Sequence, residues 1–217
     1  MLLALDTSTR YSGIALYEEG RVLLEYTWQS AHFHTRHLAP AVERAFAVTD
    51  TTPADLEGIA VATGPGSFTG LRIGLAFAKG LALTRHVPIV GIPTLDFLAA
   101  AQPASDLPLW AVLLAGRGRY SACRYHWHAG TWKAQGDLQV WKLPDLAAAL
   151  NAPARLCGEV DAEARRLLAE AAPQVEILSP AACLRRPAYL AELGWRRLQQ
   201  GAHDDPATLA PIYLHFQ

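Results

Sequence analysis

The order of predicted strands and helices repeats once along the chain, and this repeat restricts the fold more than any single motif does. Alternating apolar residues predict strands, and apolar residues spaced three and four apart predict helices. The first half is expected to have strands at 2–5, 11–17 and 21–27, a helix carrying Leu38, Val42, Ala45 and Phe46, a strand at 58–62, a helix at 69–83, a strand at 89–91 and a helix at 95–101. The second half is expected to have strands at 109–114, 119–127 and 131–141, a helix at 145–150, a strand at 155–157, a helix at 162–171, a strand at 175–178 and a helix at 181–199.

A stretch with two prolines and small polar residues, QPASDLP at 102–108, separates the two halves and indicates a boundary. We therefore expect an N-terminal lobe at 1–102 and a C-terminal lobe at 103–217, each a β-β-β-α-β-α unit. This order predicts an α/β fold of the actin-like/ribonuclease H-like type. Actin, sugar kinases and Hsp70-type ATPases have this fold and hold nucleotide between their lobes.

The residues that such a nucleotide site needs are largely missing. Asp6 ends the first strand and Thr7 follows it, but no glycine comes before Gly13. The corresponding segment of the second half, 114–120, contains no carboxylate, and the segment at 156–160 offers one glycine where several are expected beneath an adenine. Asp6 and Thr7 therefore remain weak candidates for contact with a nucleotide at an interface. A carboxylate that caps a turn is at least as good an interpretation of Asp6. We expect no catalytic residue in this chain and no ATP turnover by the isolated protein.

The glycine-rich stretch GPGSFTGLRIG at 64–74 precedes a predicted helix, which is how many proteins bind phosphate. A P-loop requires GxxxxGK[ST], but Lys79 lies deep in the helix and is followed by Gly80. A dinucleotide fingerprint requires GxGxxG, but Thr69 stands where the third glycine belongs. Gly64 and Gly66 are better explained by a tight turn into the helix.

Composition and charge indicate which classes of protein and of site are not expected here. The chain has 217 residues, a formal net charge of −1, and three cysteines without CxxC spacing. We expect a cytoplasmic protein without a signal peptide, membrane span or disulfide framework. We also expect no metal site, because the spacing of His32, His34 and His37 does not suit metal ligation. The sequence shows no arginine stripe interleaved with aromatic residues, so the chain alone should bind nucleic acid weakly.

Four stretches occurring in this order resemble the TsaB (YeaZ) family. They are LALDTST at 3–9, the helix start from His34-Thr35 to Pro40, GPGSFTGLRIG at 64–74, and PIYL at 211–214. The likeness is dense over about the first 100 residues and thin afterwards. Leu114 and His215 depart from the family pattern, at positions where Asp and Arg are usual.

The resemblance implies a noncatalytic subunit that forms a heterodimer with a metal-binding paralogue, TsaD, and is joined by the ATPase TsaE. Together they make N6-threonylcarbamoyladenosine next to the anticodon of tRNA, with ATP or ADP and the metal ion chiefly on the partners. The chain would then meet tRNA only through the complex and could form a homodimer when alone. The alternatives are an autonomous actin-like kinase or carbamoyltransferase, and an RNA-binding protein, which the charge balance disfavours.

Small residues recur every four positions in the predicted helix at 69–83, at Gly70, Gly74 and Ala78. Interior glycines lower helix stability by about 1 kcal/mol each, so a helical strip of them indicates close approach of another backbone. We expect this strip to contact the partner, with Leu71 and Leu75 beside it and Leu38, Val42, Ala45 and Phe46 on the preceding helix. Packing of the strip inside the chain is the alternative, and Gly74→Leu would distinguish the two.

Overall fold

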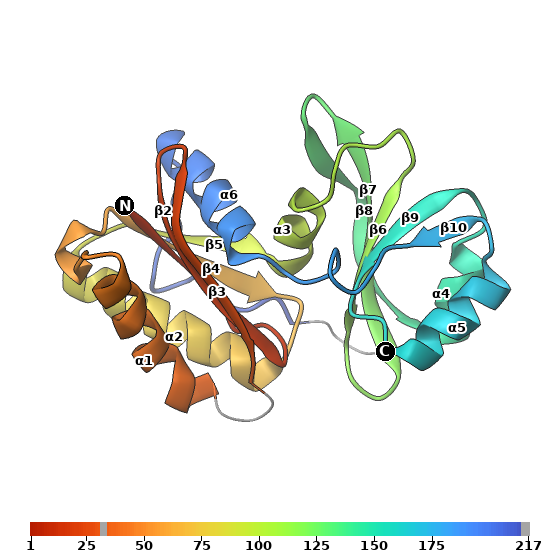
Figure 1. The fold of residues 1–217 in the computed structure, drawn as a ribbon, viewed down its shortest axis with the longest axis horizontal. Coiled ribbons are helices and arrows are strands. Elements are labelled where there is room, and N and C mark those ends of the chain that lie inside the picture. The colour runs from red at the N-terminus through yellow and green to blue at the C-terminus, as the bar shows by residue number, and fades with distance from the viewer. Residues whose placement is uncertain (31–33, 214–217) are drawn as a thin grey trace. The chain divides into compact units, whose positions relative to one another are not determined.

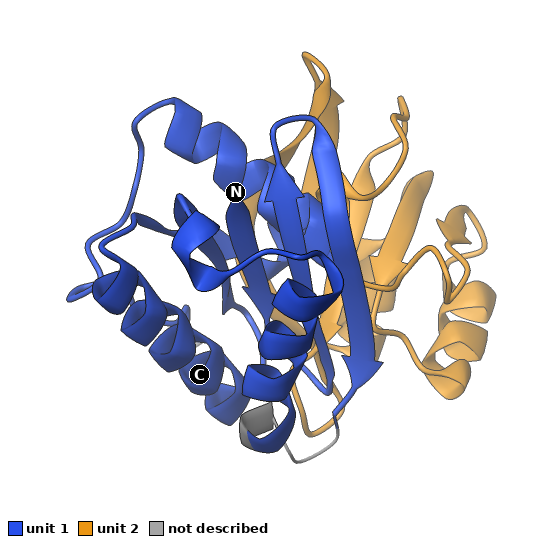
Figure 2. Cartoon of the chain, turned by 60° about the vertical axis from the view of Figure 1, so that its left-hand side comes forward, with its two compact units in different colours: residues 1–97, 186–213 blue, residues 98–185, 214–217 orange. Residues whose placement is uncertain are grey.

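The computed structural model describes residues 1–30 and 34–213, together with the side chains of these residues except those of 34 and 35. The chain forms two compact units, one of residues 1–97 and 186–213 and one built on residues 98–185 (Figure 2). The expected division at 102 therefore differs from the observed one. The chain leaves the first unit within α3 (Thr94–Ala100) and returns to it just before the last helix, α6 (Pro187–Gln199).

The first unit contains a five-stranded sheet in the order β3-β2-β1-β4-β5 (Figure 1). Its strands are β1 (Leu2–Asp6), β2 (Tyr11–Glu18), β3 (Arg21–Gln29), β4 (Gly58–Gly64) and β5 (Ile89–Pro93). The first three strands are antiparallel, and β4 and β5 run parallel to β1. Parallel strands need crossover connections, which are supplied by α1 (His34–Val48), with the short 3-10 helix η1 (Pro53–Asp55), and by α2 (Phe68–Arg85).

Side chains on the two faces of β1 enter two separate cores, because successive residues of a strand point to opposite faces. Leu3 and Leu5 pack with α1 and α2, whereas Leu2 and Ala4 pack with α6. Helices thus cover both faces of the sheet, as Figure 1 shows. The predicted C-terminal lobe included this last helix, but its apolar residues lie on the first sheet.

Helix α6 begins at Pro187 rather than at the expected residue 181. Proline has no backbone N–H and a fixed φ, so it suits the first turn of a helix and not its interior. The carboxylate of Glu25 on β3 replaces a side-chain cap, because it accepts hydrogen bonds from the backbone N–H of Ala188 at 3.0 Å and from Arg186 at 2.6 Å.

The second unit repeats the topology of the first. Its sheet has the order β10-β9-β6-β7-β8, which is the same arrangement counted from the other edge. The strands are β6 (Leu109–Leu114), β7 (Arg119–His128), β8 (Thr131–Lys142), β9 (Ala154–Gly158) and β10 (Val175–Ile177). Helices α4 (Leu143–Ala149) and α5 (Ala162–Ala171) pack on one face. The expected duplication and the actin-like/ribonuclease H-like fold class are confirmed.

Candidate partner-binding face

The glycines of the 64–74 stretch lie against the connection between β1 and β2. A Cβ atom on Gly66 would be 2.1 Å from the carbonyl oxygen of Ser8, and one on Gly70 would be 2.1 Å from that of Thr7. A Cβ on Gly74 would be 2.3 Å from Oγ1 of Thr7. Gly66 and Gly70 thus lie against backbone carbonyl groups, and Gly74 lies against the Thr7 side chain, so the glycine strip of α2 packs inside the chain.

This packing corrects the predicted partner surface. All nine residues assigned to it are buried in the first unit: Leu38, Val42, Ala45, Phe46, Gly70, Leu71, Gly74, Leu75 and Ala78. The strip was expected to face a partner. The opposite orientation is observed, because the close approach that the glycines allow is used by the Thr7–Ser8 segment.

The turn before α2 is built from the same stretch. The backbone N–H of Ser67 donates to the carbonyl oxygen of Ser8 at 2.6 Å, and the Ser67 hydroxyl accepts from the N–H of Gly70 at 3.3 Å as the helix N-cap. Gly64 has a φ of +107°, a conformation that other residues rarely adopt. The role in a tight turn that the sequence suggested for Gly64 and Gly66 therefore agrees with the structure.

An apolar groove lies between α1 and α2 on the side away from the sheet. It consists of two adjoining depressions of about 260 and 290 Å³ that share Ala39 and Phe77. The further lining residues are Leu38, Val42, Glu43, Phe46, Pro53, Ile73, Ala76 and Leu81. Three predicted residues, Leu38, Val42 and Phe46, thus form part of the groove although their side chains are buried. Contiguous apolar surface of this kind is typical of an interaction site.

Next to the groove, the surface of α2 is exposed and is not covered by other described residues. Ala76 is exposed, and a Cβ atom on Gly80 would meet nothing within 4 Å. Leu83 at the end of the row is 62% exposed. We call the groove together with Ala76, Gly80 and Leu83 the outer α1/α2 face. The sequence pattern does not identify this face, because the helical spacing of Ile73, Phe77 and Leu81 equally fits a helix face that packs on a sheet.

Two motifs from opposite ends of the sequence meet at the start of α2. The Arg72 guanidinium lies 3.8 Å from the centre of the Phe68 ring and donates a 2.8 Å hydrogen bond from Nε to the Tyr213 hydroxyl. The Phe68 and Tyr213 rings are 5.2 Å apart, and these side chains are 54% and 39% exposed. Arginine and tyrosine are common at the energetic centres of protein interfaces. His215 lies outside the described residues.

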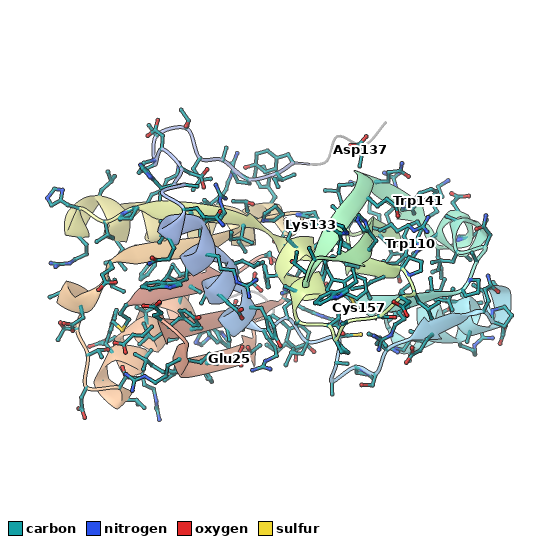
Figure 3. All side chains as sticks on the ribbon, turned by 90° about the horizontal axis from the view of Figure 1, so that it is seen from above. Glu25, Trp110, Lys133, Asp137, Trp141 and Cys157 are labelled. Carbon is teal, nitrogen blue, oxygen red and sulfur yellow. The ribbon has the colours of Figure 1, made fainter. Side chains whose placement is uncertain are left out.

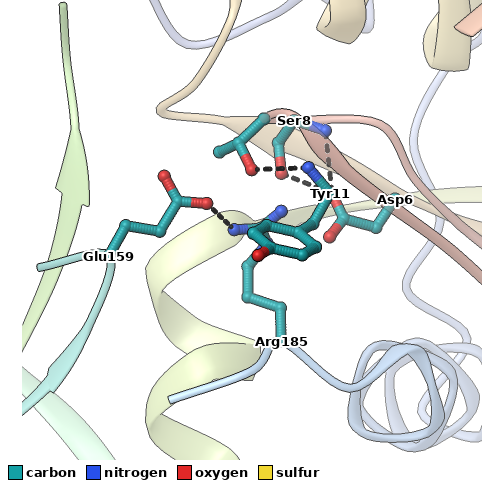
Figure 4. Close-up of polar contacts among 6 residues, drawn as sticks. Asp6, Ser8, Tyr11, Glu159 and Arg185 are labelled. Atoms are coloured by element: carbon teal, nitrogen blue, oxygen red, sulfur yellow. Dashed lines mark hydrogen bonds and ion pairs between the residues drawn. The ribbon is translucent and has the colours of Figure 1, made fainter. Parts of the chain in front are cut away.

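Asp6 and Thr7 have intramolecular partners in the first unit. Asp6 is 2% exposed, and its Oδ1 accepts hydrogen bonds from the backbone N–H of Ser8 at 2.9 Å and from the Ser8 hydroxyl (Figure 4). The Thr7 hydroxyl donates to the carbonyl oxygen of Gly70 at 2.7 Å. The geometry is that of a side chain capping a turn, which is the alternative interpretation of Asp6.

The glycines of the second unit likewise have structural roles that do not require a nucleotide. Gly158 has a φ of +122°, and a Cβ on it would be 1.9 Å from the carbonyl oxygen of Val112 on the neighbouring strand. The next residue, Glu159, forms a 2.7 Å ion pair with Arg185, whose side chain is 2% exposed (Figure 4). In the loop from 114 to 119, Gly116 and Gly118 have positive φ and serve the turn.

The described residues contain no cluster of three or more His, Cys, Asp or Glu side chains able to hold a metal ion. Of the histidines considered for this role, His37 is exposed on α1, His32 lies outside the described residues, and the side chain of His34 is likewise not described. The three cysteines are buried. Among the described helices, none is long and apolar enough to cross a membrane.

Comparison with known proteins identifies the family. The model of the TsaD family, tRNA N6-adenosine threonylcarbamoyltransferase, matches residues 28–213. The tRNA threonylcarbamoyladenosine biosynthesis protein TsaB of Bacillus subtilis (strain 168) is 38% identical over 129 residues, which cover 59% of this chain and 56% of that protein. A tRNA N6-adenosine threonylcarbamoyltransferase of Solidesulfovibrio magneticus is 34% identical over 134 residues, covering 54% and 36% of the two chains.

The chain spans about half the length of the curated relatives it matches. The solved structure of YeaZ from Pseudomonas aeruginosa resembles it throughout, with a TM-score of 0.80, 25% identity, and coverage of 98% of this chain and 99% of that one. The family model, the TsaB relatives and this structure agree with one another. The chain therefore belongs to the TsaD tRNA N6-adenosine threonylcarbamoyltransferase family and, within it, to the TsaB (YeaZ) group.

Proposed function

We propose that this chain is a noncatalytic subunit that binds a TsaD-like paralogue through the outer α1/α2 face and supports formation of N6-threonylcarbamoyladenosine in tRNA. The observation that carries the proposal is an apolar groove between two helices whose opposite faces already form the core of the first unit. Burial of such a groove by a partner is favourable by about 25 cal/mol per Å² of apolar surface.

The same packing argues against a catalytic role. In the actin-like fold, the carboxylate at the end of the first strand faces the phosphates or their metal ion. Here the Asp6 carboxylate accepts two hydrogen bonds from Ser8, and the Thr7 hydroxyl is bonded to α2. We therefore assign ATP or ADP and the metal ion chiefly to the partners, a TsaD-like paralogue and a TsaE-like ATPase, and tRNA contact to the assembled complex.

The partner surface extends in this proposal from the groove to the cluster of Phe68, Arg72 and Tyr213. Arg72 is already ordered by its contacts with both rings. A preordered side chain loses little rotamer entropy when it is buried at an interface. The exposed aromatic rings would then contribute apolar area next to the groove.

The test is calorimetric titration of the chain with the TsaD-like paralogue of the same cell. Ala76 is exposed beside the groove, so Ala76→Arg should leave the fold intact and weaken binding more than tenfold. Ala169→Arg makes the same substitution at an exposed position of α5 in the second unit and should have no effect. In parallel, the paralogue is assayed for threonylcarbamoyladenosine formation with and without this chain.

Equal binding by the two variants would place the interface elsewhere. Formation of the modified nucleoside at the same rate without this chain would refute the subunit role. ATP hydrolysis by the isolated chain that is lost on Asp6→Ala would instead favour the autonomous kinase or carbamoyltransferase.

A further inference from the structure

The free end of the β7–β8 hairpin is rich in cationic and aromatic residues. The stretch RYHWHAGTWKAQ, at 124–135, contains an arginine, a lysine, two histidines and three aromatic residues, and it has no carboxylate. It lies beyond the part of the sheet that packs with α4 and α5, where Tyr120 and Ala122 belong to the core. A hairpin end that only needed to be soluble would not require this composition.

The strand register gathers the polar residues on one face. Arg124 is opposite Gln135, His126 is opposite Lys133, and His128 is opposite Thr131. Because side chains alternate along a strand, Arg124, His126 and His128 share a face with these partners. The first two pairs and His128 are exposed. On the neighbouring strand, Trp110 is paired with Arg124 and is half-buried. We call Arg124, His126, His128, Lys133 and Gln135 the hairpin polar face.

The opposite face of the hairpin is responsible for holding it in place. Tyr125 is 2% exposed, and Nε1 of the buried Trp132 donates to the carbonyl oxygen of Gln102 at 3.1 Å. The exposed Trp127 packs edge-on against Trp132, with ring centres 5.5 Å apart. The hairpin polar face is therefore not needed for packing and is available for a ligand.

Three other cations of this unit are neutralised by the chain itself. Arg155, Arg166 and Arg185 form ion pairs with Glu176, Glu170 and Glu159. Within the described residues, neither Arg124 nor Lys133 is part of an ion pair. The one acidic residue of β8 is Asp137, which lies beyond Gln135 at the register shift between β7 and β8. Figure 3 labels Lys133 and Asp137. The face thus presents hydrogen-bond donors and positive charge.

The shape of this face favours an extended ligand. The cavity beside Arg124 and Trp110 has a volume of about 30 Å³, which is room for a water molecule or two and not for a nucleotide base. A ligand must therefore lie across the strands. Phosphate contacts from Arg, Lys and neutral hydrogen-bond donors are how proteins bind nucleic-acid backbones.

We propose that the hairpin polar face binds the ribose–phosphate backbone of the tRNA on which the complex acts. This inference rests on the proposed function. It modifies the expectation from sequence, which recognised no cationic and aromatic stripe. Lys133 joins Arg124 on one face only through the strand register. Two cations are too few for tight binding by the isolated chain, so the contact contributes within the complex.

The experiment uses a fluorescein-labelled, unmodified tRNA transcript and the complex of this chain with the TsaD-like paralogue. The test variant is Arg124→Ser/Lys133→Ser. The control is Arg166→Ser/Arg196→Ser, which removes two exposed helical cations that are paired with Glu170 and Glu192. Both variants lose the same charge. Affinity is measured by anisotropy at several salt concentrations, and complex formation is measured by calorimetry.

Loss of two phosphate contacts should weaken tRNA binding by about 25- to 60-fold at 0.1 M salt and reduce the salt dependence, log K against log salt, by about 1.4 to 1.8. The control should change affinity less than twofold, and all chains should bind the paralogue equally. A test variant with wild-type affinity and salt dependence in an intact complex would overturn this inference alone. Failure of the wild-type chain to bind the paralogue would overturn the proposed function and this inference with it.

Discussion

Replacing either of two glycines in α2 with leucine should have opposite consequences, because Gly74 and Gly80 lie on opposite sides of the same helix. A Cβ on Gly74 would be 2.3 Å from the Thr7 hydroxyl, whereas one on Gly80 would meet nothing within 4 Å. We expect Gly74→Leu to destabilise the first unit. We expect Gly80→Leu to preserve the fold and to block the outer α1/α2 face.

The magnitudes follow from the contacts at each site. Gly74→Leu overfills a buried site at a cost of about 1–3 kcal/mol and displaces the hydrogen bond from Thr7 to Gly70, worth about 1 kcal/mol. Better helix propensity returns about 0.8 kcal/mol, which leaves a net loss of roughly 1–3 kcal/mol. Gly80→Leu gains the propensity without a clash, so its free energy of unfolding should rise by about 0.8 kcal/mol.

Urea denaturation gives the two stabilities, and calorimetric titration with the TsaD-like paralogue gives the affinities. In thermal unfolding, Gly74→Leu should lower the Tm by roughly 2–12 °C, and Gly80→Leu should raise it by about 2–3 °C. Gly80→Leu should also weaken partner binding more than tenfold. If Gly74→Leu were as stable as wild type and bound the partner poorly, with Gly80→Leu unaffected, the assignment of the two helix faces would be wrong.

Two further predictions concern stability. Burial raises the pKa of the Cys157 thiol well above its ordinary value, with a smaller contribution in the same direction from Cys183, and burial also raises the pKa of Tyr120. These groups stay protonated in the folded chain at pH values where they ionise in the unfolded chain. The free energy of unfolding should therefore fall as the pH rises above about 8.5. Cys157→Ala should reduce this fall, measured by denaturation between about pH 8.5 and 10. Glu25→Ala removes the acceptor for Ala188 and Arg186 and should lower the free energy of unfolding by about 1–2 kcal/mol, measured in urea. Glu25→Gln keeps an acceptor for the Ala188 N–H and should lower it less. Equal losses in stability would refute capping by Glu25.

The sequence by itself determined the class of fold, the repeat of its elements and many of their limits. Strands can be predicted from sequence because their buried residues are mostly apolar, as in the fully buried strand β1. Helix α5 matches its expected range of 162–171, because the Asp161 side chain accepts from the N–H of Ala164 and marks its start. Such signals are local, so they survive in a single chain read without a structure. The likeness to the TsaB group was likewise carried by short motifs.

Tertiary structure alone decided which surfaces those elements bury. Helix α2 has small residues on one side and apolar residues on the other, and either side suits a core. The chain buries the small side because the Thr7–Ser8 backbone passes close to it. The α6 helix packs on the first sheet, although it follows the second in sequence, because its Leu190 and Ala191 complete the core around Leu2 and Ala4. Strand pairing alone places Lys133 and Arg124 on the same face of the sheet. These choices depend on contacts between residues distant in the chain, which periodicity and spacing do not encode.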